Sequence, residues 1–384
     1  HGDHFTLGAL IDRLVAAPSV AALLGLVLAR YEHDFEQHRP GLVADAFRAV
    51  WAGRYGLAEA ELLDLLTPGV ERLPQRTWAP LHLAAEHHLV SRGGLLGFAH
   101  ADVRRAVEER YLTTSEWRAA SHQGLARYFA SQPLGPRVAD ELGWQWAEAG
   151  DSAGLRATLA DLAWAALAYA RNPFDLRRLW YRLTPDVAGE LLTAYAPVLA
   201  APAEHDEGQL AWGVSRLLAD AGASEAALGL QRYLVNAARA DTALEPDRRL
   251  RRWASALVNL GANHLNRGEL DAAADAFEQA ATVPQLTSAA TGDLAIVRRQ
   301  QRRWSDAEAL FRQADALYRA EGALYDVQAN LAGWVELRRN QADLDGALDL
   351  LREQERICRE IADPVAIGRA LAGQAVVLSD RGRP

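Results

Sequence analysis

The sequence predicts an all-α fold that includes one small β element. Apolar residues recur at three- and four-residue steps through most of the 384 residues, which is the period of a helix buried on one side. The second half repeats itself at intervals of 34 and 40 residues, which is typical of stacked helical hairpins. Only the stretch around Gly93-Gly94 reads as two short strands joined by a glycine turn. We therefore expect a helical array with a single β-hairpin.

The repeats organise the C-terminal half. Four segments align without gaps, and they begin at Leu257, Thr291, Leu331 and Leu371. Each of the first three carries an alanine sixteen positions after its start and a bulky residue four positions later. The pairs are Ala273 and Phe277, Ala307 and Phe311, Ala347 and Leu351. A small residue lets two antiparallel helices approach, and a large one fills the gap between them. The pattern resembles tetratricopeptide repeats and predicts an α-solenoid over residues 201–384.

The first 112 residues are organised differently. Residues 1–40 read as a helical segment, and "LVADAFRAVWAGRYGLAEAELLDLL" then reads as a helix, a turn and a second helix. "WAPLHLAAEHHLVSRGGLLGFAH" reads as a third helix followed by two strands around Gly93-Gly94. Three helices and a two-stranded wing are the elements of a winged-helix module, which we place at residues 41–112.

Residues 113–200 keep the helical period, which predicts a helical linker or degenerate helical repeats. Their tryptophans are predicted to be core anchors: Trp117, Trp144, Trp146, Trp164 and Trp180. The stretch Ala201-Pro202-Ala203-Glu204 is typical of a hinge into the repeats. The predicted segments are therefore 1–40, 41–112, 113–200 and 201–384.

The composition excludes several classes of protein. The formal net charge is −9, and all 41 basic residues are arginine. A P-loop NTPase needs a lysine to reach the β- and γ-phosphates, so the chain by itself is not such an enzyme, and no other catalytic constellation stands out. The lack of any methionine predicts a fragment or a processed product. A lone cysteine, with no signal peptide or membrane span, favours the cytoplasm.

Three stretches together resemble one family. They are "GRYGLAEAELLDLL", "LPQRTWAPLHLAAEHHLVSRGGLLGFAHADVRRAVEERYL" and the repeat array. They are similar to the C-terminal part of STAND-type signalling NTPases, most of all the nephrocystin-3-like and telomerase-protein-component-like proteins. The resemblance covers essentially the whole chain and is most specific over residues 54–112. It implies a preceding NTPase domain that binds ATP or ADP, no cofactor in this chain, and it allows an oligomer on activation.

The same resemblance implies a role for His100. In the family, a histidine at the end of the wing contacts the ADP phosphate in the resting form, and His100 matches it in "FAHADVR". Arg104 matches the arginine of the next helix, whereas Ala101 places Asp102 one position late against the family motif. An imidazole can donate to a phosphate oxygen, and its pKa rises beside an anion. The alternative is a structural histidine that caps the next helix or packs in the wing.

Two other kinds of site find little support. DNA binding needs basic residues on the third helix of a winged helix, and "WAPLHLAAEHHLV" contains no arginine, so we expect no nucleic-acid partner. His82 and Glu86 share a helix face, but no His-Glu-x-x-His sequence and no pair of cysteines supports a metal site.

The repeats are expected to bind a protein or peptide on their concave face, which the first helix of each hairpin forms. Residues eight and nine positions after each repeat start should point there: Leu265, Asn266, Arg299, Gln300, Arg339, Asn340, Ser379 and Asp380. Ala262, Ile296 and Glu336 share this face by period. Arginine beside amide groups suits an acidic peptide or a carboxylate, although exposed helix positions are also polar for solubility alone.

The expected function is therefore that of the regulatory and sensor region of a STAND signalling ATPase. The repeats would bind the trigger, and the winged helix would hold the missing NTPase inactive. A plain interaction scaffold and a part of a transcription regulator remain alternatives.

Overall fold

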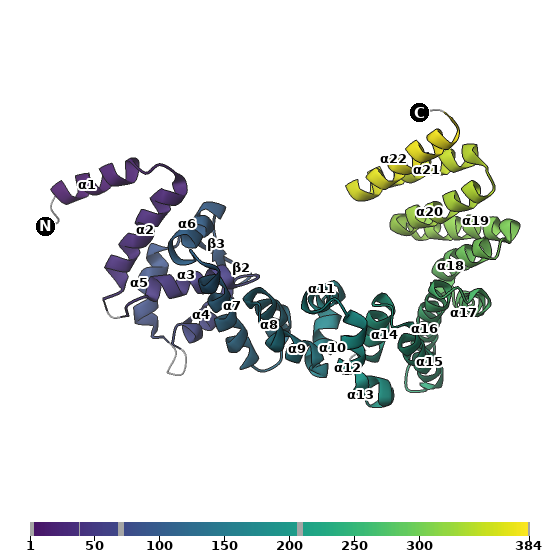
Figure 1. Cartoon of the computed structure of the whole chain (residues 1–384), viewed down its shortest axis with the longest axis horizontal. Helices are drawn as coiled ribbons and strands as arrows, with labels where there is room; N and C mark the ends of the chain where they lie inside the picture. The colour runs from purple at the N-terminus through teal and green to yellow at the C-terminus, as the bar shows by residue number, and fades with distance from the viewer. Residues whose placement is uncertain (1–3, 38, 68–72, 206–209, 383–384) are drawn as a thin grey trace. The chain divides into compact units, whose positions relative to one another are not determined.

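The chain is almost entirely helical, as the sequence predicts. The computed structural model describes residues 4–37, 39–67, 73–205 and 210–382, and among these residues one sheet of three short strands is present. The chain forms two compact units, His1–Val187 and Ala188–Pro384 (Figure 1). The all-α class with a small β element is therefore confirmed.

The first unit begins with six helices and three strands. They are α1 (His4–Val15), α2 (Val20–Phe35), α3 (Leu42–Ala52), β1 (Leu57–Ala58), α4 (Glu59–Leu65), α5 (Gln75–Ala84), β2 (Leu89–Arg92), β3 (Leu95–Phe98) and α6 (Ala101–Tyr111). The strand order is β1-β3-β2 with antiparallel neighbours, and Leu57 of β1 pairs with Leu96 of β3. The sequence does not predict β1, because two residues are too few to show a period.

The hairpin of β2 and β3 follows the prediction. Gly93 and Gly94 have φ angles of 59° and 81°, the left-handed values that a two-residue hairpin turn requires. Leu96 of the central strand is buried, and the Phe98 ring stacks on Phe47 of α3 with 6.3 Å between the ring centroids. Packing of this kind fixes one face of the hairpin on the helices.

The helix before the hairpin lies earlier in the chain than predicted. α5 begins at Gln75 and therefore includes Arg76, so the statement that this helix carries no arginine is wrong. It ends at Ala84, and His87 and His88 lie in the turn that follows. The difference arises because the apolar period does not mark the first turn of a helix.

Five more helices extend the first unit. They are α7 (Ser115–Ala130), α8 (Pro136–Ala149), α9 (Ser152–Ala160), α10 (Leu162–Arg171) and α11 (Pro173–Leu183). Trp164 and Trp180 are buried core anchors as predicted, and Trp144 and Trp146 are half-buried. The prediction is wrong for Trp117, which is 48% exposed. One face of its ring is covered by the guanidinium of Arg48, 4.0 Å from the ring centroid, and the remainder faces solvent.

The second unit is a succession of helices. They are α12 (Val187–Ala194), α13 (Ala196–Ala200), η1 (Pro202–His205), α14 (Leu210–Asp220), α15 (Ser224–Ala240), α16 (Pro246–Asn266), α17 (Leu270–Ala281), η3 (Pro284–Leu286), α18 (Thr287–Gln300), α19 (Trp304–Glu321), α20 (Leu324–Asn340), α21 (Leu344–Glu360) and α22 (Pro364–Asp380). From α14 onward each helix packs mainly against the helices next to it in sequence, as Figure 1 shows for α16 to α22.

The predicted small and large residues form the core of the repeats. All six are at most 4% exposed: Ala273, Phe277, Ala307, Phe311, Ala347 and Leu351. The large residues lie against glycines: Phe277 against Gly261, Phe311 against Gly333 and Leu351 against Gly373. Since these glycines have no Cβ, the helices approach closely, and the predicted helical hairpins are confirmed.

The turn inside each hairpin contains a residue with left-handed backbone. Gly268 occupies this position in one hairpin with φ 75°, and Arg302 and Ala342 occupy it in the next two with φ 60° and 58°. Left-handed backbone costs a residue with a Cβ about 1–2 kcal/mol, which the greater freedom of glycine in the unfolded chain partly offsets. We therefore expect Ala342→Gly to raise the free energy of unfolding by roughly 0.5–1 kcal/mol.

The reciprocal change provides the control. No atom lies within 4 Å of where a Cβ at Gly268 would be, so Gly268→Ala introduces conformational strain without a clash. We expect it to lower the free energy of unfolding by a similar amount. Thermal unfolding followed by circular dichroism measures both, and equal melting temperatures for the two variants would contradict the argument.

Candidate binding groove and the His100 junction

A groove of about 380 Å³ runs between α20 and α22, with α21 as its floor. Its lining residues are Gln328, Ala329, Ala332, Val335, Glu336, Arg339, Leu351, Gln354, Arg369, Gly373 and Val377. Most of the small apolar lining residues come from the two walls, α20 and α22: Ala329, Ala332, Val335, Gly373 and Val377. The Gln354 side chain is buried and held in place, because its Nε2 donates to the Gln328 carbonyl at 3.0 Å.

Charged groups stand along the groove. Arg339 Nη1 lies 3.1 Å from Glu336 Oε1, and its Nη2 lies 3.8 Å from Asp380 Oδ2. Arg369 is exposed and forms no hydrogen bond or ion pair with any residue that the structure describes. One guanidinium is therefore balanced within the chain and the other is free. Small apolar lining residues beside a free guanidinium suit a ligand that carries a short side chain next to a carboxylate.

The structure brings together only part of the predicted partner-binding set. Glu336 and Arg339 line the groove, whereas the exposed side chains of Asn266, Gln300 and Asn340 do not. Arg299 of α18 is half-buried, and its Nε has no hydrogen-bond partner among the described residues.

Sequence reasoning missed Arg369 and the two contacting glutamines, Gln328 and Gln354. Arg369 precedes the aligned start of the last repeat by two positions, outside the two positions considered for each repeat. Gln354 belongs to the second helix of a hairpin, where a polar residue reads as solvent-facing.

His100 lies at the junction of β3 and α6. It is the N-cap residue of α6, but its side chain makes no capping hydrogen bond. The side chain is exposed and has no hydrogen-bond partner in the described parts of the chain, so it neither caps the helix nor packs in the hairpin. Burial lowers the pKa of the neighbouring His88, and the charges of His87 and His100 lower it further. Three imidazoles therefore lie near one another at this edge.

The residues around His100 are occupied with one another. Arg104 lies 3.4 Å from Glu108, and its guanidinium stands 5.1 Å from the centroid of the Trp51 ring. Asp102 lies 3.7 Å from Arg105. His100 is thus the group at this junction that has its hydrogen-bonding capacity available.

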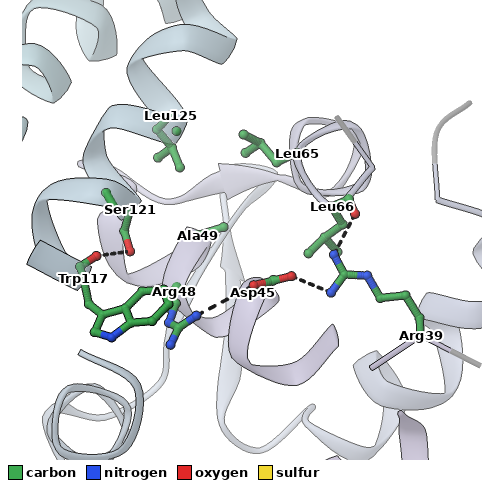
Figure 2. A pocket seen from close by; sticks show the side chains of 11 residues that line it. Arg39, Asp45, Arg48, Ala49, Leu65, Leu66, Trp117, Ser121 and Leu125 are labelled. Carbon is green, nitrogen blue, oxygen red and sulfur yellow. Dashed lines mark hydrogen bonds and ion pairs between the residues drawn. The ribbon is translucent and has the colours of Figure 1, made fainter. Parts of the chain in front are cut away.

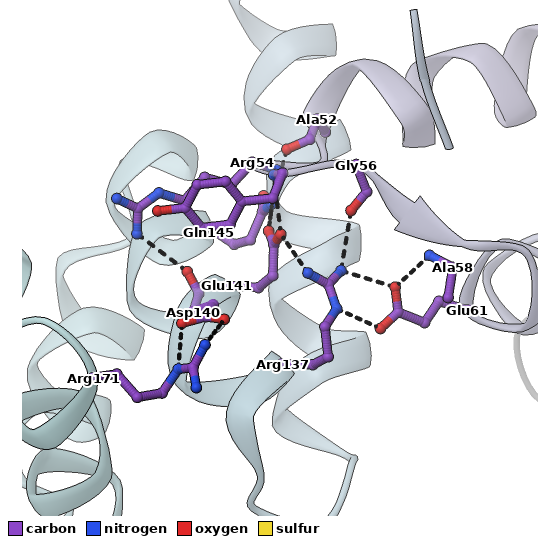
Figure 3. Close-up of polar contacts among 11 residues, drawn as sticks. Ala52, Arg54, Gly56, Ala58, Glu61, Arg137, Asp140, Glu141, Gln145 and Arg171 are labelled. Atoms are coloured by element: carbon purple, nitrogen blue, oxygen red, sulfur yellow. Dashed lines mark hydrogen bonds and ion pairs between the residues drawn. The ribbon is translucent and has the colours of Figure 1, made fainter. Parts of the chain in front are cut away.

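A buried ion network joins the segment around β1 to α8 (Figure 3). Arg137 of α8 meets Glu61 of α4 in a two-pronged pair, with both N–O distances 2.9 Å. Its Nη1 donates to Glu141 at 3.2 Å, and its Nη2 donates to the Gly56 carbonyl at 3.0 Å. Burial alone would lower the pKa of Arg137, but Glu61 and Glu141 hold it above its usual value.

Glu141 is the buried centre of this network. It is fully buried, and it accepts hydrogen bonds from the Arg54 backbone and the Gln145 amide at 3.2 and 2.9 Å. Gln145 Oε1 in turn accepts from Nδ1 of the His122 ring at 2.9 Å. The network therefore joins four parts of the first unit: the segment before β1, α4, α7 and α8. Its hydrogen bonds polarise one another where the side chains are buried.

A second hollow of about 310 Å³ lies between α3, α4 and α7 (Figure 2). Arg39 contacts Asp45 at 2.5 Å and donates to the Leu66 carbonyl at 2.8 Å. Arg48 donates to the Tyr111 carbonyl at 3.0 Å. Both guanidiniums are engaged within the chain, so this hollow is a joint between helices.

The remaining candidate sites have ordinary surroundings. His82 stacks on Trp78 and lies 3.6 Å from Glu59. Within the described ranges, no three His, Cys, Asp or Glu side chains are grouped so that they could hold a metal ion. None of the helices in those ranges is long and apolar enough to cross a membrane.

Comparisons with known proteins agree with the repeat architecture. No protein-family model matches the chain. A TPR repeat-containing protein of Dictyostelium discoideum is 29% identical over 181 residues, which is 47% of this chain and 11% of that protein. Nephrocystin-3 of Mus musculus is 28% identical over 243 residues, which is 59% of this chain and 17% of that protein. The predicted resemblance to nephrocystin-3-like proteins is therefore confirmed.

Two further similarities complete the comparison. NACHT domain- and WD repeat-containing protein 1 of Mus musculus is 34% identical over 116 residues, which is 25% of this chain and 7% of that protein. A STAND protein with a tetratricopeptide repeat sensor from Pyrococcus horikoshii has a TM-score of 0.39 and 13% identity, over 92% of this chain and 62% of that one. The chain spans less than a fifth of the length of each of the three sequence relatives.

Proposed function

We propose that this chain is the sensor and regulatory region of a STAND-type signalling ATPase. Residues 201–384 bind a protein trigger, and residues 41–112 act as a winged helix that holds a separate NTPase domain in its ADP state. Nucleotide belongs to that NTPase domain, and the chain itself works by binding. The similarity to nephrocystin-3 and to a protein named for its NACHT domain supports this assignment.

The observation that carries the regulatory half is the free, exposed imidazole of His100. A histidine fixed at a strand end with no partner in its own chain can donate to a phosphate oxygen of a docked nucleotide.

We expect His100→Ala to release ADP from the full-length protein. A hydrogen bond to a charged group contributes about 1.5–3 kcal/mol, so ADP should dissociate roughly ten times faster or more. The bound nucleotide is measured by chromatography of the denatured protein and by the rate of ADP release. His87→Ala is the matched control, since His87 is also exposed and lies in the turn after α5. Equal ADP retention by wild type and His100→Ala would show that His100 does not hold the nucleotide, and it would favour a plain interaction scaffold.

The trigger site is the groove between α20 and α22, and its ligand carries a carboxylate. Arg369 is the informative residue, because it has no partner within the described chain whose loss would confuse the result. We expect Arg369→Ala to weaken binding of peptides selected from a random display library roughly tenfold or more.

Isothermal titration of selected peptides measures this loss. Arg352→Ala is the control, because Arg352 is an exposed arginine of α21 that already pairs with Asp349. Unchanged affinity in Arg369→Ala would exclude the groove as the trigger site.

A further inference from the structure

Asp293 of α18 belongs to the same face as the groove. It stands two positions after the repeat start Thr291, and the groove-lining Gly373 stands two positions after the repeat start Leu371. The Asp293 side chain is half-buried, yet it forms no hydrogen bond or ion pair with any residue that the structure describes. A half-buried carboxylate without a counter-ion is unusual outside functional sites.

Two more oxygen atoms without a hydrogen-bond partner in the described chain, Asn330 Oδ1 and the Tyr318 hydroxyl, lie near Gly292, the residue before Asp293. Asn330 is 7% exposed, and its Nδ2 donates to the Phe311 carbonyl while its Oδ1 accepts nothing. A Cβ on Gly292, the residue before Asp293, would lie 3.1 Å from the Tyr318 hydroxyl and 3.6 Å from Asn330 Oδ1. Burial and the nearby charge of Asp293 raise the pKa of Tyr318, and burial raises the pKa of Asp293 to about 6. The charge of Asp293 therefore acts on the Tyr318 hydroxyl, and neither Asp293 nor Asn330 Oδ1 is paired with a cation among the described residues.

The preceding repeat shows which group fits here. Asn259 stands two positions after the repeat start Leu257, in the same place as Asp293, and its Oδ1 accepts from Nη1 of Arg216 at 2.5 Å. Leu210, with Ala226 and Leu230 at the two repeat offsets, starts a degenerate earlier copy of the repeat, and Arg216 stands six positions after it. Asn263 stands six positions after Leu257, and its amide donates to the Ser224 carbonyl and to Gln231 Oε1. The chain thus supplies a guanidinium to the amide of Asn259 and none to the carboxylate of Asp293.

We infer that Asp293 binds a lysine or arginine side chain of the partner segment held on this face. The ammonium or guanidinium donates to the Asp293 carboxylate, as Arg216 donates to Asn259 in the preceding repeat. This inference rests on the proposed function, in which Arg369 binds a carboxylate of the ligand. It adds a basic residue to the same ligand.

The test is a selection of random peptides on the whole chain, on Asp293→Asn and on Asp349→Asn. Asp349 is an exposed carboxylate of α21, so the control removes the same charge away from this face. We expect wild type and Asp349→Asn to enrich peptides with a basic residue at one fixed position, and Asp293→Asn to lose that preference. A selected lysine peptide should bind Asp293→Asn roughly ten to a hundred times more weakly than wild type. The norleucine version of that peptide should bind both proteins equally.

Each other outcome decides against the inference. Peptides that bind wild type without a basic residue would overturn it while leaving the groove and the proposed function intact. Equal binding of the lysine peptide to wild type and Asp293→Asn would overturn it as well. If no peptide is enriched on wild type, the peptide-binding function and this inference fall together. Asp293→Asn keeps the shape of the side chain and removes an unbalanced charge, so misfolding does not confuse the result.

Discussion

Arg137→Ala is expected to lower the free energy of unfolding of the first unit by about 3–5 kcal/mol. The substitution leaves Glu141, which is fully buried, and Glu61, whose side chain is 14% exposed, without their cation. Coulomb attraction that offset the desolvation of two carboxylates is lost, and the Gly56 carbonyl loses a donor. The cost is large because Glu141 is fully buried and keeps its charge without a counter-ion.

The measurement is calorimetric unfolding of the whole chain, with hydrogen exchange of residues 54–62 and 137–145 to locate the effect. Arg171→Ala is the control, since Arg171 pairs with Asp140 on the same helix α8 but at the surface. Exposed pairs contribute about 0–1 kcal/mol, so this variant should unfold nearly as wild type. The double variant Arg137→Met with Glu141→Gln should recover part of the loss, because it removes the fully buried one of the two unpaired charges and leaves Glu61, which is 14% exposed. A loss of less than about 1 kcal/mol in Arg137→Ala would refute the network as a source of stability.

The network also restricts the motion of the segment around β1 relative to α8. Three hydrogen bonds from the Arg137 guanidinium join residues 54–61 to α8, and two of them form a fork on Glu61. A two-pronged pair resists sliding as well as separation. The segment around β1 is therefore held firmly against α8, and we expect any hinge of the first unit to lie outside this contact.

Local patterns in the sequence predicted the local parts of the structure. The alanine and phenylalanine spacing identified the repeat cores, because both residues of each pair belong to one helix and their burial follows from its period. Glu336 and Arg339 were placed on one face for the same reason. The glycine turn of the hairpin needed only the conformational freedom of Gly93 and Gly94.

Contacts between distant segments were not predictable in this way. Arg137 and Glu61 are 76 residues apart, and nothing in either segment marks the other as its partner. Trp117 shows the same limit, because a tryptophan at a helical period reads as core whether an apolar neighbour or an arginine covers it. Arg369 was missed because it meets the groove from a helix that follows in the next repeat. The division of the chain into four segments, with a winged helix at 41–112, remains a proposal.

Asp293→Asn is expected to stabilise the second unit above pH 6 and to leave its stability unchanged near pH 4. The folded chain holds the Asp293 proton up to about pH 6, whereas the ordinary pKa of this carboxyl is 3.8. Folding therefore costs nothing extra at this site below pH 3.8, and the cost grows as the pH rises from 3.8 through about 6. It then levels off at roughly 3 kcal/mol, because both states are ionised. Asparagine carries no charge to bury, so the variant escapes this cost.

The difference in unfolding free energy between Asp293→Asn and wild type, measured by urea titration at several pH values, isolates this carboxyl. Other groups titrate in both proteins and cancel. Asp349→Asn should show no such rise with pH, since that carboxylate is exposed. A flat difference for Asp293→Asn would mean that the Asp293 carboxylate is well solvated in the free protein. A rise between pH 4 and 6 would show instead that the unliganded chain holds a destabilising charge at the position where we place a partner's basic side chain. Binding of that side chain would then recover the lost stability.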